Sequence, residues 1–223
     1  MMGAILNIGA LCLCLVPVLV IFFRQAWQSS LQPYLLAFCL VSFLHLLIRT
    51  LLPYPESHYT VVNTHIIFNL AEFLLIGMLL RAYLQTNWLK QGFTLLAVAL
   101  ISVQLTVYAL RENIGAAHPF DLLQTLVILG MGILALAQLL REAPLNIFQL
   151  PVFWILGGIL CYNSMYLLVN LLPGGNPFQD DGGPESTVFL LALLMLRAIF
   201  FTVAAASASK PATRPAPGQE PLY

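Results

Sequence analysis

The residues of this chain that could do chemistry stand inside long apolar runs. His65, Asn69 and Glu72 are spaced i, i+4, i+7 in "NTHIIFNLAEFLLIGMLLRAYL", so a helix would place them on one face. Arg197 stands near the middle of a second run, "STVFLLALLMLRAIFFTVAAASAS". A charged residue at the centre of a bilayer costs on the order of 2.5–3.5 kcal/mol on insertion scales. Glu72 is therefore predicted to face a bundle interior and to have a partner.

Arg197 is the candidate partner. Glu72 lies about 12 residues from the start of its run and Arg197 about 10, which is a depth difference of about 3 Å at 1.5 Å per residue. Two interpretations stay open. The pair could fix helix register without binding anything, or it could mark a ligand, proton or conformational switch site. Because desolvation offsets much of the attraction in a buried pair, intramembrane charge favours function more than charge in a soluble core does.

Further polar residues recur at helical spacing in other runs. His45 and Arg49 are an i, i+4 pair, and Asn163 and Tyr166 share a face in "CYNSMYLLVN". If these faces converge, they form a polar cavity that opens outward. Each residue could instead form an ordinary hydrogen bond between helices, and the Arg49 side chain could extend to the membrane–water interface. Asn170 shares the face of Asn163 and Tyr166, Tyr162 lies beside it, and the fourth span adds Gln104 and Tyr108.

Catalytic and cofactor chemistry finds little support. His45, His65 and Glu72 are ligand types that zinc accepts, but the seven-helix zinc hydrolases would need further histidines on the last run, which has none. No Gly-x-Ser-x-Gly or His-Glu-x-x-His motif is present. Lys90 and Lys210 fall at the edges of apolar runs, which argues against a retinal Schiff base. We expect no enzyme activity, no metal and no cofactor.

Composition points to lipid as the solvent of this chain. Its 223 residues are 60% hydrophobic and only 8% charged, against about 25% charged in a soluble domain. The apolar runs are long and unbroken, which favours helices over barrel strands. Net charge is zero and no basic stripe suggests nucleic acid. The four cysteines lie in apolar runs and are predicted to be small core residues.

Seven apolar segments predict an all-α, seven-helix transmembrane bundle. We expect one membrane domain over 1–209 and a disordered, Pro-rich cytoplasmic tail over 210–223. The first segment lacks the basic n-region and cleavage site of a signal peptide, so it is predicted to be a retained span. The spans are about 4–23, 32–52, 60–80, 92–110, 120–140, 151–172 and 187–209.

The basic residues predict the orientation. Six lie in the first, third and fifth loops and the tail, against Arg49 and Arg111 on the other side. The positive-inside rule then places the N-terminus outside and the C-terminus in the cytoplasm. "HLLIRTLLP" and "YLLVNLLP" close the second and sixth spans, which suggests parallel repeats of spans 1–3 and 5–7 around a linking fourth.

Two stretches carry a resemblance to known sequences. In "FNLAEFLLIGMLLRAYL" and "FWILGGILCYNSMYLLVNLL", Asn69, Glu72, Phe153, Trp154 and Tyr162 match an Asn…Glu and Phe-Trp…Tyr pattern. With these residues the chain resembles small uncharacterised bacterial seven-helix integral membrane proteins of a sensor-kinase-associated type. That resemblance implies a sensory role by association and an inner-membrane location. It carries no catalytic residues.

We therefore expect a multi-pass protein of the inner membrane with a polar intramembrane site, used for ligand sensing or signal coupling. The cytoplasmic segments are short, so the signal must pass to a separate membrane or cytoplasmic partner. The mechanism would be competition of an outside ligand for the Glu72–Arg197 pair. The alternatives are a small 3+1+3 transporter and a structural subunit of a membrane complex.

Overall fold

The computed structural model describes residues 2–24, 32–51, 58–84, 86–110, 118–142, 147–171 and 184–208, and this part of the chain is all helical, as predicted. Several polar side chains of these helices donate a hydrogen bond to the backbone carbonyl four residues earlier, as Asn170 does to Tyr166. The predicted tail, 210–223, lies outside the described residues. The helices are α1 Met2–Phe23, α2 Gln32–Leu51, α3 His58–Tyr83, α4 Asn87–Leu110, α5 His118–Glu142, α6 Pro151–Leu171 and α7 Pro184–Ser207, with a short 3-10 helix, η3 Ile147–Gln149.

Six of these helices are long and apolar enough to cross a membrane, by length and composition, and they identify a multi-pass membrane protein. In α2 the apolar stretch found within the described residues is shorter, Gln32–Ile48. The whole of α2 has 20 residues, or about 30 Å at 1.5 Å per residue. Its length therefore suffices for a bilayer.

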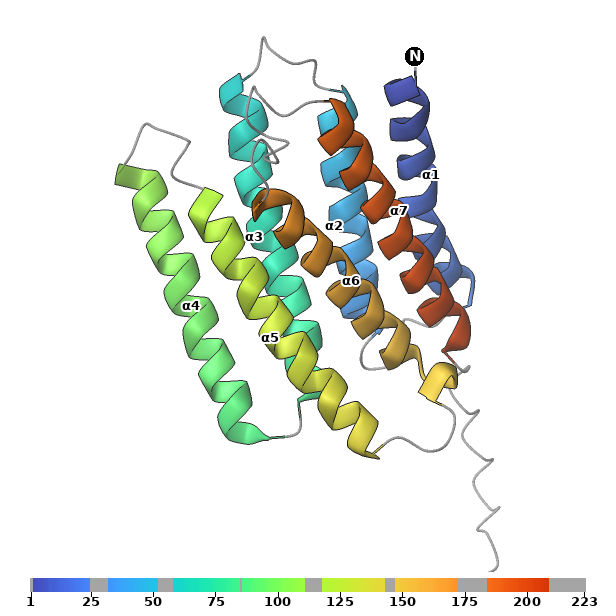
Figure 1. The fold of residues 1–223 in the computed structure, drawn as a ribbon, viewed down its shortest axis with the longest axis vertical. Coiled ribbons are helices and arrows are strands. Elements are labelled where there is room, and N and C mark those ends of the chain that lie inside the picture. Colours follow the sequence, from blue (N-terminus) through green and yellow to red (C-terminus); the bar gives the residue numbers. More distant parts are fainter. Residues whose placement is uncertain are drawn as a thin grey trace, which may run out of the picture.

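The helices form a closed ring with one helix outside it. Neighbours in contact follow the order α1, α2, α3, α5, α6, α7 and back to α1, while α4 packs mainly against α3 and α5 (Figure 1). The chain begins at one end of the bundle and α7 finishes at the other (Figure 1). At that second end, Arg24 Nη1 donates to the carbonyl of Ala206, which ties the end of α1 to the end of α7.

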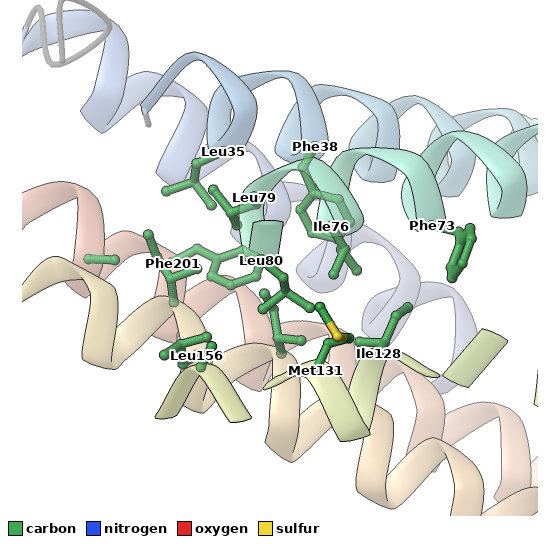
Figure 2. Close-up of a cluster of buried hydrophobic side chains, with 14 of the residues drawn as sticks. Leu35, Phe38, Phe73, Ile76, Leu79, Leu80, Ile128, Met131, Leu156 and Phe201 are labelled. Carbon is green, nitrogen blue, oxygen red and sulfur yellow. The ribbon is translucent and has the colours of Figure 1, made fainter. Parts of the chain in front are cut away.

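An apolar core fills one half of the ring. Figure 2 shows side chains from α2, α3, α5, α6 and α7 packed together there, including Leu35, Phe38 and Phe201. The rings of Phe38 and Phe201 meet edge to face at a centroid distance of 5.6 Å. Cys39 belongs to the same cluster, and all four cysteines of the chain are free. This half of the bundle is closed by close-packed side chains.

Candidate functional site: a charged cavity within the helix ring

The other half of the ring encloses a polar cavity of about 90 Å³. Among the side chains that the structure describes, those that line it come from five helices and none comes from α1 or α4. The lining residues lie in the first half of α5 and near the middle of α3 and α7. On α2 and α6 they lie in the second half of the helix. The cavity therefore extends from the middle of the bundle toward the end at which α3, α5 and α7 begin. Ile76 and Ile128 line it and also belong to the apolar core, so they form its floor.

The deepest charged group in the cavity is the predicted pair of Glu72 and Arg197. Arg197 Nη1 lies 3.5 Å from Glu72 Oε2. Ser42, on α2, stands between them: its hydroxyl donates to Glu72 Oε1 at 3.0 Å and accepts from Arg197 Nη2 at 3.2 Å. His45 Nδ1, one turn further along α2, lies 3.8 Å from Glu72 Oε1. Three helices thus meet at one carboxylate.

Two aromatic rings hold the guanidinium of Arg197. Its Cζ atom lies 4.1 Å from the ring centroid of Tyr162 and 4.8 Å from that of Phe38. Such cation–π contacts contribute about 0.5–2 kcal/mol each, more when desolvated. The side chain is only 4% exposed. Its Nη1 atom makes the ionic contact with Glu72. It has no hydrogen-bond partner among the residues that the structure describes.

A second polar network lies beside the first. Asn69 Nδ2 donates to Asp121 Oδ1 at 2.6 Å and makes a longer contact with Gln124 Oε1 at 3.5 Å. Gln124 Nε2 in turn donates to Gln104 Oε1 at 2.5 Å, and this bond joins α5 to α4. Because Asn69 and Glu72 are three residues apart on α3, the two networks are offset by about 4.5 Å along the helix axis.

The structure brings together Glu72, Arg197, His45, Asn69, Asn163 and Tyr166 of the predicted site, which all line the cavity. His45 also stacks on Phe68 at a centroid distance of 5.1 Å. Asn163 Nδ2 donates to the Ile159 carbonyl of its own helix, so this bond is not interhelical glue. The predictions for His65, Arg49 and Tyr108 fall outside the side chains that the structure describes. Asn170 and Gln104 are described but do not line the cavity.

Four polar cavity residues were not predicted from the sequence: Ser42, Asp121, Gln124 and Thr125. Asp121 was not considered because it stands next to the predicted start of a span, where an acidic residue is unremarkable. Ser42 was overlooked because serine is a common, small residue in membrane helices. A signal did exist: Asp121, Gln124 and Thr125 recur at i, i+3, i+4 on one face.

The cavity offers carboxylates, a guanidinium, an imidazole, amides and hydroxyls, which suits hydrogen bonding and charge recognition. Within the described residues, no group of three or more His, Cys, Asp or Glu side chains could hold a metal ion. Comparisons with protein-family models, with curated proteins and with solved structures found no match. The geometry of the site and the fold therefore carry the functional argument.

Proposed function

We propose that this protein is a sensory membrane protein that binds a small polar solute in the cavity and couples its occupancy to a separate partner. One observation carries the proposal: a cavity with charged walls stands in one half of the bundle, and close-packed apolar side chains close the other half. A solute would enter from the end at which α3, α5 and α7 begin. It would not pass the floor formed by Ile76 and Ile128 in this state.

The number of polar groups favours binding over a purely structural role. A pair that only fixes helix register needs Glu72 and Arg197 and no cavity. Here Asp121, Asn69 and Gln124 add a second polar network beside that pair. Each polar group inside a membrane is costly, and such groups usually mark sites of binding or transport. A structural subunit would have no use for this arrangement.

The networks also supply a route from the cavity to the packing of the helices. Bonds from Ser42, Arg197 and Asn69 join α2, α3, α5 and α7 around the cavity. A solute that competes for these bonds would change which helices are held together. It shifts the equilibrium only as far as it binds the two packings differently.

We further propose seven spans, with α2 as the seventh, in a bacterial inner membrane. Six basic residues of the first, third and fifth loops and the tail would then face the cytoplasm. The cavity would face outside, and the signalling partner would contact the cytoplasmic end. The resemblance to small sensor-kinase-associated membrane proteins supports this assignment.

Transport is a second candidate, and the order of the helices favours it. Each neighbour contact within α1–α3 has a counterpart within α5–α7, and the contact of α3 with α5 corresponds to that of α7 with α1. The fourth helix lies outside the ring (Figure 1). This is the arrangement expected of two parallel three-helix repeats with a linking helix, as some transporters have. A transporter would open the floor of the cavity to the other side.

Cysteine accessibility tests the proposal. Thr125→Cys places a thiol on the cavity wall, and Ala135→Cys places one in the apolar core of the same helix. Each variant is treated in sealed vesicles with Ag⁺, a thiol reagent small enough for the cavity, with free cysteine as scavenger on one side. The thiols that remain unreacted are then labelled after unfolding. We expect Thr125→Cys to react from the N-terminal side only, and Ala135→Cys to match the wild-type background.

Three outcomes discriminate between the functions. Equal, background reactivity of both variants would mean a dry cavity and would overturn the binding function. Reaction of Thr125→Cys from both sides would replace sensing by transport. Reaction from the N-terminal side alone supports a one-sided binding site.

A further inference from the structure

The volume of the cavity limits its ligand to a very small solute. An apolar cavity of about 150 Å³ in an engineered protein holds benzene, which has six heavy atoms, or about 25 Å³ for each. By that measure the cavity of about 90 Å³ takes roughly four heavy atoms, with some extra room toward its mouth. Drug-sized ligands need roughly 300–1,000 Å³. Lipids, sugars and nucleotides are therefore too large.

The deep end of the cavity requires a hydrogen-bond acceptor. Arg197 is 4% exposed and lines the cavity, and its Nη1 lacks a hydrogen-bond partner among the described residues. The oxygens of Glu72 are already engaged by Ser42, His45 and the ionic contact with Arg197. A buried donor without a hydrogen-bond acceptor is destabilising by about 1–3 kcal/mol. A ligand carboxylate is the acceptor that a guanidinium binds best.

The second network offers acceptors instead. Asp121 presents a carboxylate, and the side-chain amide of Asn69 is oriented with its nitrogen toward that carboxylate, which leaves its oxygen as a further acceptor. Gln124 adds an amide oxygen whose contact with Asn69 is long, at 3.5 Å. A cationic nitrogen with several N–H donors fits such a set. This group of acceptors lies about 4.5 Å along α3 from the Glu72 level.

The charges exclude simpler ligands. The described lining side chains include two carboxylates, Glu72 and Asp121, against one guanidinium, Arg197. An anion alone would bring a third negative charge beside the two carboxylates. A cation alone would leave Arg197 Nη1 without an acceptor. A solute with both an ammonium and a carboxylate satisfies both ends and leaves the net charge unchanged.

We infer that the cavity binds a small zwitterion, a glycine-sized amino acid, with its carboxylate on Arg197 and its ammonium on Asp121. The inference rests on the proposed binding function and names the substrate class of that same site. Glycine has five heavy atoms, and its two charged ends are separated by one carbon, which matches both the volume and the short offset of the two polar networks. Larger side chains would meet Phe73, Ile76 and Ile128.

The test compares glycine with its two halves. The purified protein in lipid nanodiscs is incubated with radiolabelled glycine, and acetate or methylammonium is added as competitor. We expect glycine to bind about tenfold or more tightly than either fragment, because each fragment makes only one of the two charge-assisted contacts that glycine makes. Asp121→Asn should weaken glycine about tenfold and leave competition by acetate in place. Thr94→Val is the control: it removes a hydroxyl that donates to the Lys90 carbonyl of α4, outside the cavity lining, and should bind glycine as the wild type does.

The other outcomes are equally decisive. Methylammonium binding as tightly as glycine would make this a cation site, and acetate binding as tightly would make it an anion site. Either result overturns the zwitterion and keeps the binding function. No binding of any probe, together with a reactive Thr125→Cys, overturns the zwitterion alone. No binding together with an unreactive Thr125→Cys overturns the binding function as well.

Discussion

Neutralising one member of the Glu72–Arg197 pair should destabilise the protein more than neutralising both. Removing one partner of a buried ion pair typically costs about 3–5 kcal/mol, because the other charge is left uncompensated. In a chain of this size, that corresponds to a fall in melting temperature of about 6–20 °C. Glu72→Gln with Arg197→Gln removes both charges, so the double variant should recover about 2–3 kcal/mol relative to the sum of the singles.

The surroundings predict an asymmetry between the two single variants. Glu72→Gln leaves Arg197 charged and 4% exposed, with Ser42 and two aromatic rings as its remaining contacts. A guanidinium cannot be deprotonated in a protein, whereas a carboxylate can take up a proton. Arg197→Gln leaves Glu72 beside His45 and Ser42, which can compensate it. Glu72→Gln should therefore be the more destabilising change.

A charge reversal refines the test. Glu72→Arg with Arg197→Glu restores an ion pair, but it places a carboxylate against the rings of Tyr162 and Phe38 and a cation beside His45. We expect only partial recovery, about 1–2 kcal/mol over the worse single variant, because the cation–π contacts are lost.

Thermal unfolding in detergent measures all five forms, the wild type included. Our reasoning would be refuted if both single variants melted within about 1 °C of the wild type, well below the shift expected for a buried pair, or if their effects in the double variant were simply additive. Glu72 and Arg197 would then be energetically independent. Glu72 would need a bound ion, proton or ligand as its counter-charge.

Two further predictions concern helix packing. Gln104→Leu should destabilise the protein by about 1–3 kcal/mol in the same unfolding assay, because it leaves the buried amide of Gln124 without its acceptor. Adding Gln124→Leu should restore part of the lost stability. A further loss in the double variant would contradict the bond between α4 and α5. Gly158→Ala should cost about 1–3 kcal/mol, since an added Cβ would lie 2.9 Å from Phe200 Cβ. Gly130→Ala is its control, with nothing within 4 Å of the added carbon, and should be neutral or slightly stabilising.

Much of the site could be predicted because helical spacing and depth are local properties. His45, Asn69, Glu72, Asn163 and Tyr166 were identified from their faces alone, and they line the cavity. Matching of depth was sufficient to suggest Arg197 as the partner of Glu72, since the rise per residue is constant. Depth says nothing about which helices are neighbours, so contact between α3 and α7 through Ser42 could not be derived that way.

The second network shows where such reasoning stops. Gln104 was recognised as a polar residue of the fourth span that would join the cavity if the polar faces converged. It instead accepts a hydrogen bond from Gln124 behind the cavity wall. Asp121 stands in the first turn of α5, where an acidic residue is ordinary on a helix dipole argument, so only its contact with Asn69 reveals its place in the site.

The sequence by itself determined the helical character of the chain, its apolar spans and the polar face of each, because length, composition and periodicity act within one helix. The tertiary structure decided the ring order, the position of α4 outside it and the closing of one half by apolar side chains. These depend on the rotation of each helix about its axis and on side-chain packing across helices, and neither is written in the periodicity of any single run. The cavity arises from that packing, since five helices must meet before Glu72, Asp121 and Arg197 share one space.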